Sequence, residues 1–474
     1  MSFQDQIIKI VGAEAFIEEP ERLIVYECDA LTLEKFIPQA VVLPANREEV
    51  IAVVRCCHTH GIPIVPRGAG TSLSGSVLAV EGAIVLCLSR LQSIVHIDPD
   101  NQRALVEAGC VNAWITRAAQ PHGLYYAPDP SSQYACTIGG NIATNSGGPH
   151  TLKHGVTTNH VLGLECILPS GEVIWLGADM DSGDDTPGLD LRGVLIGSEG
   201  MFGVVTRALV RLLPEPETRE TLLVVFDNVE QASCSVGDII REGIVPGAIE
   251  MMDALITQAV EEAYHFGFPL DAGAILIVEL DGHQEQVLSE SEQTQSICRA
   301  NGAREVRRAE TTQQRAELWK SRKRAFGAIG RISPNYLTQD GVVPRSRLPD
   351  IMHYISEVSK ACSLRICNVF HAGDGNIHPL ILFDERDPDQ VQRAVRAGED
   401  ILMRCLELGG SVSGEHGIGV EKIPLMSKQF TPEDLQAMKD LRHVFDPKET
   451  CNPHKMFPSA RRCADFVARK QAPV

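Results

Sequence analysis

The order of apolar and polar residues in the first two hundred positions predicts helices and strands in turn. The stretch REEVIAVVRCCHTHG has helical spacing and ends at Gly61, a residue typical of a helix C-terminus. IPIVPR then predicts a strand that runs into the glycine-rich segment GAGTSLSG. The runs GAIVLCLSRL, SIVHID and RALVEAG predict further strands, and LGLECILPSGEVIWLG predicts a hairpin that turns at Pro169-Ser170-Gly171.

A break in this pattern near residue 215 predicts a domain boundary. GVVTRALVRLLPEPE reads as a strand that ends in a run of Pro and Glu. Beyond it, TLLVVFD and AILIVELDG predict strands, while NVEQASCSVGDIIREG and TQQRAELWKSRKRAFGAIG predict helices. Strands mixed with helices in this way indicate an α+β domain with an antiparallel sheet. We therefore expect one domain over 1–215, a second over 216–410 and a C-terminal segment over 411–474.

The segment CNVFHAGDGNIHPLILF predicts a hairpin with a histidine on each side of its turn. An Asp-Gly pair between apolar runs favours a two-residue type I′ turn, here at Asp374 and Gly375. That turn places His371 directly opposite His378, so both side chains point to one face. Two adjacent imidazoles suit a metal ion held at about 2.0–2.1 Å. A hairpin tip with both histidines in water fits this stretch equally well.

Composition excludes several classes of protein. The chain has 474 residues, 44% of them hydrophobic, and a net charge of −19, which disfavours nucleic acid and anionic membrane surfaces as partners. It has no apolar run of 18 residues and no signal or transit peptide pattern at its N-terminus. Its 14 cysteines form no C-x-x-C pair, which argues against an iron–sulfur cluster and indicates free thiols in the cytoplasm.

The loop PRGAGTSLSG, residues 66–75, is the first of three segments rich in small residues. Consecutive backbone N–H groups in such a loop form a concave site for a phosphate. The loop lacks the third glycine and the following helix of a dinucleotide-binding motif, and it lacks the Gly-Lys-Ser/Thr ending of a Walker loop. Taken alone, a plain glycine-rich turn is the simpler interpretation. The later segments 128–155 and 197–205 are similar, and three such loops between strands indicate a large ligand that carries a pyrophosphate.

These three loops, in this order, resemble the FAD-binding domain of the vanillyl-alcohol oxidase / p-cresol methylhydroxylase superfamily. The motifs HAGDGNIHP, SGEHGIGVEK and CNPHKMFP resemble its FAD-linked D-2-hydroxyacid dehydrogenase branch, which includes the FAD-linked subunits of bacterial glycolate oxidases. The resemblance implies an α+β, two-domain FAD-binding fold of the p-cresol methylhydroxylase type with an antiparallel-sheet substrate or cap domain. It also implies that residues 411–474 return to the flavin.

The resemblance further implies noncovalent FAD, because the first loop lacks the histidine to which many relatives attach the flavin. It assigns the pyrophosphate to 66–75 and the flavin to 128–148 and 197–205. The residues expected to bind FAD are Pro66, Arg67, Gly68, Ala69, Gly70, Thr71, Ser72, Gly75, Pro130, Ser131, Thr137, Gly139, Gly140, Asn141, Ala143, Thr144, Asn145, Gly147, Gly148, Glu199, Gly200, Gly203, Val204, Val205 and Asn452. His454 occupies a position where the family commonly has glycine.

The loop GGSVSGEHGIGVEK places Glu415 next to His416. Adjacent side chains are expected to point in different directions, so that one can bind a metal while the other faces a substrate. With His371 and His378, Glu415 would complete a His₂Glu site with open positions, the pattern of catalytic zinc. A loop exposed to solvent is the alternative. The resemblance implies the same three ligands, a divalent metal such as zinc, and His416 as the catalytic base.

Arg322 lies within the apolar arc of the helix predicted over ELWKSRKRAFGAIG. A buried guanidinium needs a carboxylate, which another part of the protein or a substrate can supply. The resemblance favours the substrate. Asn376, in the hairpin, is expected to bond the substrate or to steady the histidines.

Together these features predict oxidation of a small D-2-hydroxy acid, glycolate or D-lactate, to the 2-keto acid, with hydride transfer to FAD. Phe326 and Thr338 stand where relatives that act on 2-hydroxyglutarate have residues for a second carboxylate, and neither carries a charge. The alternatives are a D-2-hydroxyglutarate dehydrogenase, a zinc hydrolase without flavin, or a non-catalytic flavoprotein subunit. Electrons are expected to pass to a quinone or to a partner iron–sulfur subunit of a glycolate oxidase-like complex. Such partners would bring this cytoplasmic protein to the inner membrane.

Overall fold

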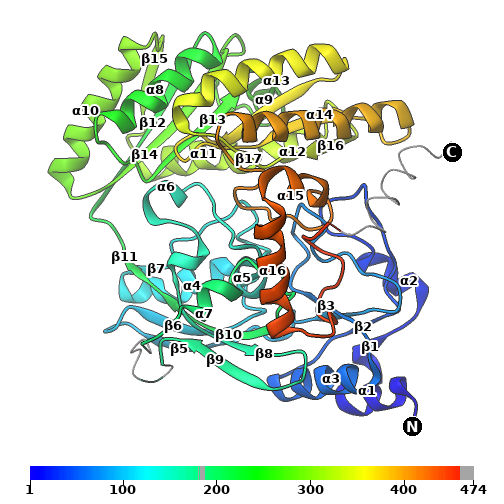
Figure 1. Cartoon of the computed structure of the whole chain (residues 1–474). Helices are drawn as coiled ribbons and strands as arrows, with labels where there is room; N and C mark the ends of the chain where they lie inside the picture. Colours follow the sequence, from blue (N-terminus) through cyan, green and yellow to red (C-terminus); the bar gives the residue numbers. More distant parts are fainter. Residues whose placement is uncertain (180, 182–186, 459–474) are drawn as a thin grey trace. The chain divides into compact units, whose positions relative to one another are not determined.

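A computed structural model describes residues 1–179, 181 and 187–458, in which the chain forms two compact units (Figure 1). Unit 1 comprises residues 1–147 and 155–215 together with the described residues from Glu415 onward. Unit 2 comprises residues 148–154 and 216–414. Among the described residues, no helix has both the length and the apolar character that crossing a bilayer requires.

The first sheet of unit 1 has the strand order β1-β2-β4-β3, in which β2 and β3 run parallel to β4. Helix α3 begins after the N-cap Asn46 and ends before Gly61, whose φ of +65° is readily adopted by glycine, so the predicted helix end is confirmed. The elements of this part are α1 (Phe3–Val11), β1 (Phe16–Ile17), α2 (Pro20–Leu23), β2 (Ala40–Val42), α3 (Arg47–His60), β3 (Ile64–Arg67) and β4 (Ile84–Cys87).

The second sheet of unit 1 is antiparallel, with the order β5-β6-β10-β8-β9. The predicted hairpin is formed by β8 and β9, and Gly171 in its turn has a φ of +83°. The remaining elements of unit 1 are β5 (Ile94–Asp98), β6 (Arg103–Glu107), α4 (Asn112–Ala119), β7 (Leu124–Tyr125), α5 (Ile138–Thr144), β8 (Val161–Ile167), β9 (Val173–Gly177), α7 (Leu191–Leu195), β10 (Val204–Arg211), β11 (Leu213–Pro214), α15 (Ile423–Gln429) and α16 (Pro432–Phe445).

Unit 2 is built on a nine-stranded sheet whose pairs are antiparallel. Its main path runs β15-β12-β14-β13-β18-β19-β17, and β20 pairs with both β16 and β18. The strands are β12 (Thr218–Phe226), β13 (Ala248–Asp253), β14 (Ala274–Gly282), β15 (Glu305–Arg308), β16 (Asn335–Thr338), β17 (Gly341–Val342), β18 (Ile366–His371), β19 (Asn376–Ile377) and β20 (Pro379–Phe383).

Helices cover both faces of this sheet, which explains why its central strands are buried along nearly their whole length. Helices α8, α10, α13 and α14 form one layer, and α9 and α12 pack on the opposite face (Figure 1). The helices of unit 2 are α6 (Thr151–His154), α8 (Val229–Arg241), α9 (Ala254–Tyr264), α10 (Gln284–Ala300), α11 (Thr312–Lys323), α12 (Ala325–Ile329), α13 (Leu348–Cys362) and α14 (Pro388–Glu407).

The helix predicted through ELWKSRKRAFGAIG is interrupted. Arg324 has a φ of −91° and a ψ of −3°, so α11 ends there and the short helix α12 begins. Ala325, Ala328 and Ile329 of α12 join α9 and the sheet in one apolar core. Arg322 therefore lies at the end of a helix, beside a core rather than along a continuous apolar stripe.

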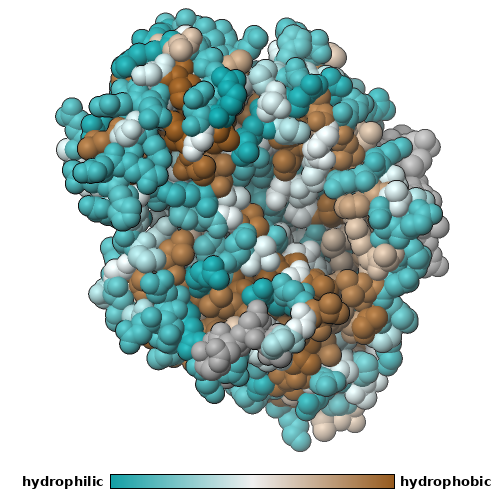
Figure 2. All heavy atoms as spheres, turned by 60° about the vertical axis from the view of Figure 1, so that its left-hand side comes forward, coloured by the Kyte–Doolittle hydropathy of each residue, from teal (hydrophilic) through white to brown (hydrophobic). Residues whose placement is uncertain are grey.

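The outer surface is mainly polar in the view of Figure 2, where hydrophilic residues surround smaller hydrophobic areas in both units. The cysteines that the structure describes are all free thiols.

Candidate active site

The hairpin of HAGDGNIH exists, but its register differs from the predicted one. His371 pairs with Asn376 rather than with His378, and residues 372–375 form a four-residue loop. Only Gly375 in this loop has a positive φ, of +80°, which excludes the type I′ turn. The side chain of Asp374 accepts a hydrogen bond from the Asn376 N–H at 3.1 Å and so fixes the wider turn.

The two histidines nevertheless lie side by side. A register shift of two residues keeps every side chain on its original face, since the period of a strand is two. The ring centroids of His371 and His378 are 5.1 Å apart, with the planes at 89° to each other. Both residues are buried, each with 2% of its surface exposed, which excludes the interpretation as a solvated hairpin tip.

A buried glutamate that the sequence reasoning missed joins two of the predicted site residues. Glu250 lies on β13 directly opposite His371 on β18. One oxygen of its carboxylate, Oε1, is 2.6 Å from Nδ1 of His371. The other, Oε2, accepts a hydrogen bond of 2.6 Å from Nε of Arg322. Unit 2 therefore brings Arg322, Glu250 and His371 into one chain of charge-assisted contacts.

Burial and charge act in opposite directions on Glu250, which has no exposed surface. Removal from water alone would raise the pKa of its carboxyl, but the neighbouring His371 and Arg322 outweigh that effect and lower the pKa. An ionised carboxylate only accepts hydrogen bonds, so Nδ1 of His371 is the donor in this contact. Nε2 of His371 then carries the lone pair of the ring, the usual arrangement of a metal-binding histidine held by a carboxylate.

Glu250 thus supplies, within unit 2, the carboxylate that the buried Arg322 requires. This carboxylate accepts a hydrogen bond from Nε of the guanidinium and leaves Nη2 without one from it. The side chain of Arg322 is 2% exposed, and its Nη2 atom is buried without a hydrogen-bond partner among the described residues. The amide oxygen of Asn376 is likewise buried and unpartnered within the described part of the chain. Unsatisfied polar atoms are costly when buried, so both are candidates to contact a ligand.

In unit 1, the predicted FAD loops converge. A Cβ at Gly68 would lie 2.2 Å from Oγ1 of Thr137, so the first loop touches the second. Gly200, whose φ is +73°, packs a third loop against Pro66, since a Cβ there would be 3.3 Å from the proline ring. The hydroxyl of Thr137 is buried without a partner among the described residues. Small residues and an unsatisfied donor at the meeting point of the loops fit a polar, extended group such as FAD.

The C-terminal segment of unit 1 contacts these same loops. Nδ2 of Asn452 donates to the carbonyl oxygens of Ser76 at 2.8 Å and of Glu199 at 2.6 Å. Nζ of Lys455, which is fully buried, donates to the carbonyl of Leu78 at 2.7 Å. The segment that carries the predicted Asn452 therefore ties two of the glycine-rich loops together.

Glu199, predicted to contact FAD, uses its carboxylate to bind the loop that follows His416. The carboxylate accepts hydrogen bonds from the backbone N–H groups of Ile418, at 2.6 Å, and Gly419, at 2.9 Å. Burial raises the pKa of Glu199 to about 7, although these bonds and the nearby Lys455 oppose the rise. Ser74 also donates to the carbonyl of His416 at 3.1 Å.

Glu415 and His416 lie in unit 1, where the carboxylate of Glu415 accepts a hydrogen bond of 3.1 Å from the backbone N–H of Gly147. Their side chains do not diverge as expected, because Nε2 of His416 is 3.9 Å from Oε1 of Glu415. The glycines around them allow this chain path, in which Gly417 has a φ of +86°. Both side chains are mostly buried, which excludes the interpretation as a solvated loop.

The chain reaches Glu415 through a segment that unit 2 holds firmly. Asp340, which is fully buried, accepts hydrogen bonds from the hydroxyl of Ser413 at 2.7 Å and from the N–H of Gly414 at 3.1 Å. A Cβ at Gly414 would lie 2.4 Å from Nδ2 of Asn376, so only glycine fits there. Asp340 was not predicted, and a lone aspartate before a strand gives no signal of this role.

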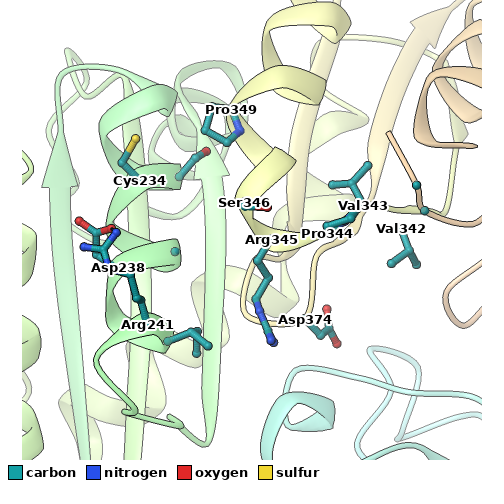
Figure 3. Close-up of a pocket in the computed structure, with 15 residues that line it drawn as sticks. Cys234, Asp238, Arg241, Val342, Val343, Pro344, Arg345, Ser346, Pro349 and Asp374 are labelled. Atoms are coloured by element: carbon teal, nitrogen blue, oxygen red, sulfur yellow. The ribbon is translucent and has the colours of Figure 1, made fainter. Parts of the chain in front are cut away.

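A separate pocket in unit 2 contains none of the predicted site residues. It lies between α8 and the segment around Arg345, and its volume is about 860 Å³ (Figure 3). Asp374 of the hairpin turn lines this pocket together with Arg345, which donates to the carbonyl of Gly373 at 3.2 Å. The pocket therefore borders the turn, and neither His371 nor His378 lines it.

Comparison with protein families identifies two domains in the chain. Residues 38–177 match an FAD binding domain, and residues 215–456 match the C-terminal domain of FAD linked oxidases. The second match covers most of unit 2 and extends into the loop of His416 and the segment of Asn452.

Individual relatives give the same result over nearly the whole chain. The glycolate oxidase subunit GlcD of Escherichia coli K12 is 47% identical over 94% of this chain and 89% of that protein. The D-lactate dehydrogenase of Anaerostipes hadrus is 29% identical over 88% of this chain and 89% of that protein. The crystal structure of p-cresol methylhydroxylase with substrate bound superposes with a TM-score of 0.80 at 17% identity, covering 95% of each chain, which confirms the predicted fold type.

Proposed function

Because the chain belongs to the family of FAD-linked oxidases, we propose that it is an FAD-dependent dehydrogenase of a small D-2-hydroxy acid, glycolate or D-lactate. The observation that carries this proposal is the buried group in unit 2, where Nη2 of Arg322 has no hydrogen-bond partner among the described residues and Nε is connected through Glu250 to His371. A guanidinium with a free nitrogen recognises a carboxylate, the group common to all 2-hydroxy acids. The names of the relatives, a glycolate oxidase subunit and a D-lactate dehydrogenase, agree with this substrate class.

Each residue has a distinct role in the proposed reaction. Nη2 of Arg322 binds the substrate carboxylate, and the amide of Asn376 bonds the substrate hydroxyl. The imidazole of His416 accepts the proton of that hydroxyl as general base. The three loops of unit 1 would hold FAD noncovalently, and the flavin would supply the acceptor for the hydride from the substrate α-carbon.

His371, His378 and Glu415 are the proposed ligands of a divalent metal, with zinc the metal that this donor set suits best. The hydrogen bond from His371 to Glu250 supports the assignment, because it orients the ring as metal-binding histidines are oriented. When bound, the metal would lower the pKa of the substrate hydroxyl.

A small substrate is favoured over 2-hydroxyglutarate. Thr338 is buried on the face of the sheet that also carries Leu380, and its hydroxyl has no partner among the described residues. Phe326 packs near Tyr336, with ring centroids 6.4 Å apart. Neither position offers a cation to a second carboxylate.

For the electrons, we propose a quinone or a partner iron–sulfur subunit as acceptor, consistent with the subunit status that the name of the GlcD relative states. Partner flavin and iron–sulfur subunits would then hold this cytoplasmic chain at the inner membrane. Reduction of an artificial dye by the purified protein, faster after addition of the candidate partner subunits, is the expected result.

The test of the reaction is anaerobic bleaching of the bound flavin by glycolate, D-lactate, L-lactate and D-2-hydroxyglutarate, repeated after chelation of metal. Glycolate or D-lactate should bleach the flavin fastest, and chelation should slow bleaching while the flavin stays bound. Bleaching only by D-2-hydroxyglutarate would identify that compound as the substrate in place of glycolate or D-lactate. A colourless protein that hydrolyses esters or amides would favour the zinc hydrolase, and a coloured protein that no hydroxy acid bleaches would favour the non-catalytic subunit.

Arg322→Lys is the sharpest variant for the substrate anchor. Lysine keeps a cation for Glu250 but lacks the second nitrogen, so KM should rise about 10–100-fold while Tm changes little. Arg331→Lys, at an exposed arginine of the same unit, is the matched control and should keep the wild-type KM. An Arg322→Lys enzyme with wild-type KM would exclude Arg322 as the anchor.

A further inference from the structure

The two oxygens of Glu250 serve two different residues of the proposed site, and this carboxylate has no role in the reaction itself. Oε1 contacts Nδ1 of His371 and Oε2 contacts Nε of Arg322, both at 2.6 Å. All three side chains are almost completely buried, so water does not compete for these bonds. The pairing of Glu250 with His371 across β13 and β18 fixes the distance by backbone geometry.

We propose that Glu250 is a positioning residue that holds His371 in the tautomer with the proton on Nδ1, so that Nε2 can bind the metal. The inference rests on the proposed function, since it assumes a metal on His371. A neutral imidazole carries one proton, and the partner of one ring nitrogen decides which nitrogen has it. A carboxylate can only accept, so Nδ1 must donate and Nε2 keeps its lone pair.

The same carboxylate orients the substrate anchor. With Nε of Arg322 bound to Glu250, the guanidinium plane is fixed, and so is the direction of Nη2, which has no hydrogen-bond partner in the described part of the chain. Glu250 therefore sets the distance between a metal ligand and the group that binds the substrate carboxylate. A glutamate that only neutralised Arg322 would not need to contact the histidine.

Glu250→Gln tests the tautomer directly, because glutamine has the same shape but one acceptor and one donor group. If its oxygen continues to accept from Arg322, its NH₂ group faces Nδ1 of His371. The histidine can satisfy that NH₂ only by moving its proton to Nε2, which then cannot bind a metal. Metal affinity, measured by competition with a coloured chelator on the purified flavoprotein, should fall about 10–100-fold.

Glu279→Gln is the matched control. Glu279 is also a buried glutamate of the same sheet that contacts a histidine, since its Oε1 is 3.2 Å from Nε2 of His150. His150 is not a proposed metal ligand. Glu279→Gln should therefore keep the metal affinity within about threefold of wild type, even if its Tm falls.

Glu250→Gln also removes the negative charge beside Arg322, so a lower Tm alone would not identify the tautomer effect. The double variant Glu250→Gln/Arg322→Met removes both charges and should recover Tm without recovering metal affinity. Recovery of metal affinity together with Tm would overturn the proposal and leave Glu250 as a structural counter-ion.

Two failures are distinguishable in this design. Wild-type protein that binds metal, with a Glu250→Gln variant that binds it equally well, overturns the role of Glu250 and leaves the metal site intact. Wild-type protein that binds no metal, while its flavin is still reduced by a hydroxy acid, removes the metal from the proposed function and this role of Glu250 with it.

Discussion

Replacing Asn452 with alanine should loosen the part of unit 1 that is proposed to hold FAD. Its side chain is 1% exposed and reaches two loops that lie far apart in the sequence. The bonds from Nδ2 to the carbonyls of Ser76 and Glu199, at 2.8 and 2.6 Å, connect the residue that follows the first glycine-rich loop to the third loop. Asn452 also has a φ of +40°, in the region that asparagine tolerates better than most residues.

The magnitude follows from these contacts. Each buried carbonyl that loses its donor destabilises the folded state by about 1–3 kcal/mol, so two carbonyls give about 2–6 kcal/mol. Alanine at a positive φ adds about 1 kcal/mol of backbone strain. At about 2–4 °C per kcal/mol for a large domain, Tm should fall by about 6–28 °C. Because Ser76 and Glu199 adjoin the proposed FAD loops, FAD should also dissociate more readily.

The assay is thermal unfolding followed by flavin fluorescence and by circular dichroism, with and without excess FAD. Asn452→Gly removes the same bonds without the strain at positive φ, so the difference between the two variants isolates the backbone term. Asn101→Ala is the control, since Asn101 is exposed and its side-chain amide donates to Asp98 at 2.8 Å. If Asn452→Ala lowered Tm no more than Asn101→Ala, the two carbonyl bonds would not hold the loops together.

Two further variants test local features. His454 is exposed and has a φ of +61°, a conformation that glycine adopts more readily than histidine. His454→Gly should therefore raise the free energy of unfolding by up to about 1 kcal/mol, with a slight rise in Tm, and should keep FAD bound. A clear loss of stability would mean that the imidazole itself has a role. Asp281 is mostly buried, which by itself would raise its pKa, but His154 and Lys153 lower the pKa overall. A lowered pKa in the folded state stabilises the protein above the unfolded value near 4, and that stabilisation is lost as the pH falls through the folded value. Asp281→Asn should therefore be about 2 kcal/mol less stable than wild type at pH 7, and the deficit should shrink only at pH values well below the unfolded value; a deficit that does not shrink in strong acid would contradict the charge argument.

The hairpin shows which part of a site local sequence can predict. The Asp-Gly pair located the turn, and the alternation of apolar residues placed both histidines on the buried face. The register was wrong by two residues, because Asp374 bonds the N–H of Asn376 and widens the loop. An even shift leaves the faces unchanged, so the prediction that His371 and His378 are neighbours is confirmed although the pairing behind it is not.

Glu250 shows what local sequence could not predict. It lies in GAIEMMDAL, between apolar residues of a strand that ends at Asp253, and a charged residue buried in this way must have a partner. Nothing in that stretch identifies the partner, since His371 follows 121 residues later. The same gap exists for Arg322. Its need for a carboxylate was predicted, but Glu250 was not predicted to supply it. Both gaps have one cause: the pairing of β13 with β18 is a property of the whole sheet.

The loop of His416 links the proposed base to the proposed cofactor site within unit 1. The chain leaves unit 2 after Gly414, and the residues that follow are held by groups from the FAD loops. Gly147 donates to the carboxylate of Glu415, Ser74 donates to the carbonyl of His416, and Glu199 accepts from the residues that follow. These bonds join positions separated by more than 200 residues, so the loop cannot keep its conformation unless the FAD loops are folded. The return of the chain to unit 1 thus makes the geometry of the base depend on the same backbone that is proposed to bind the flavin.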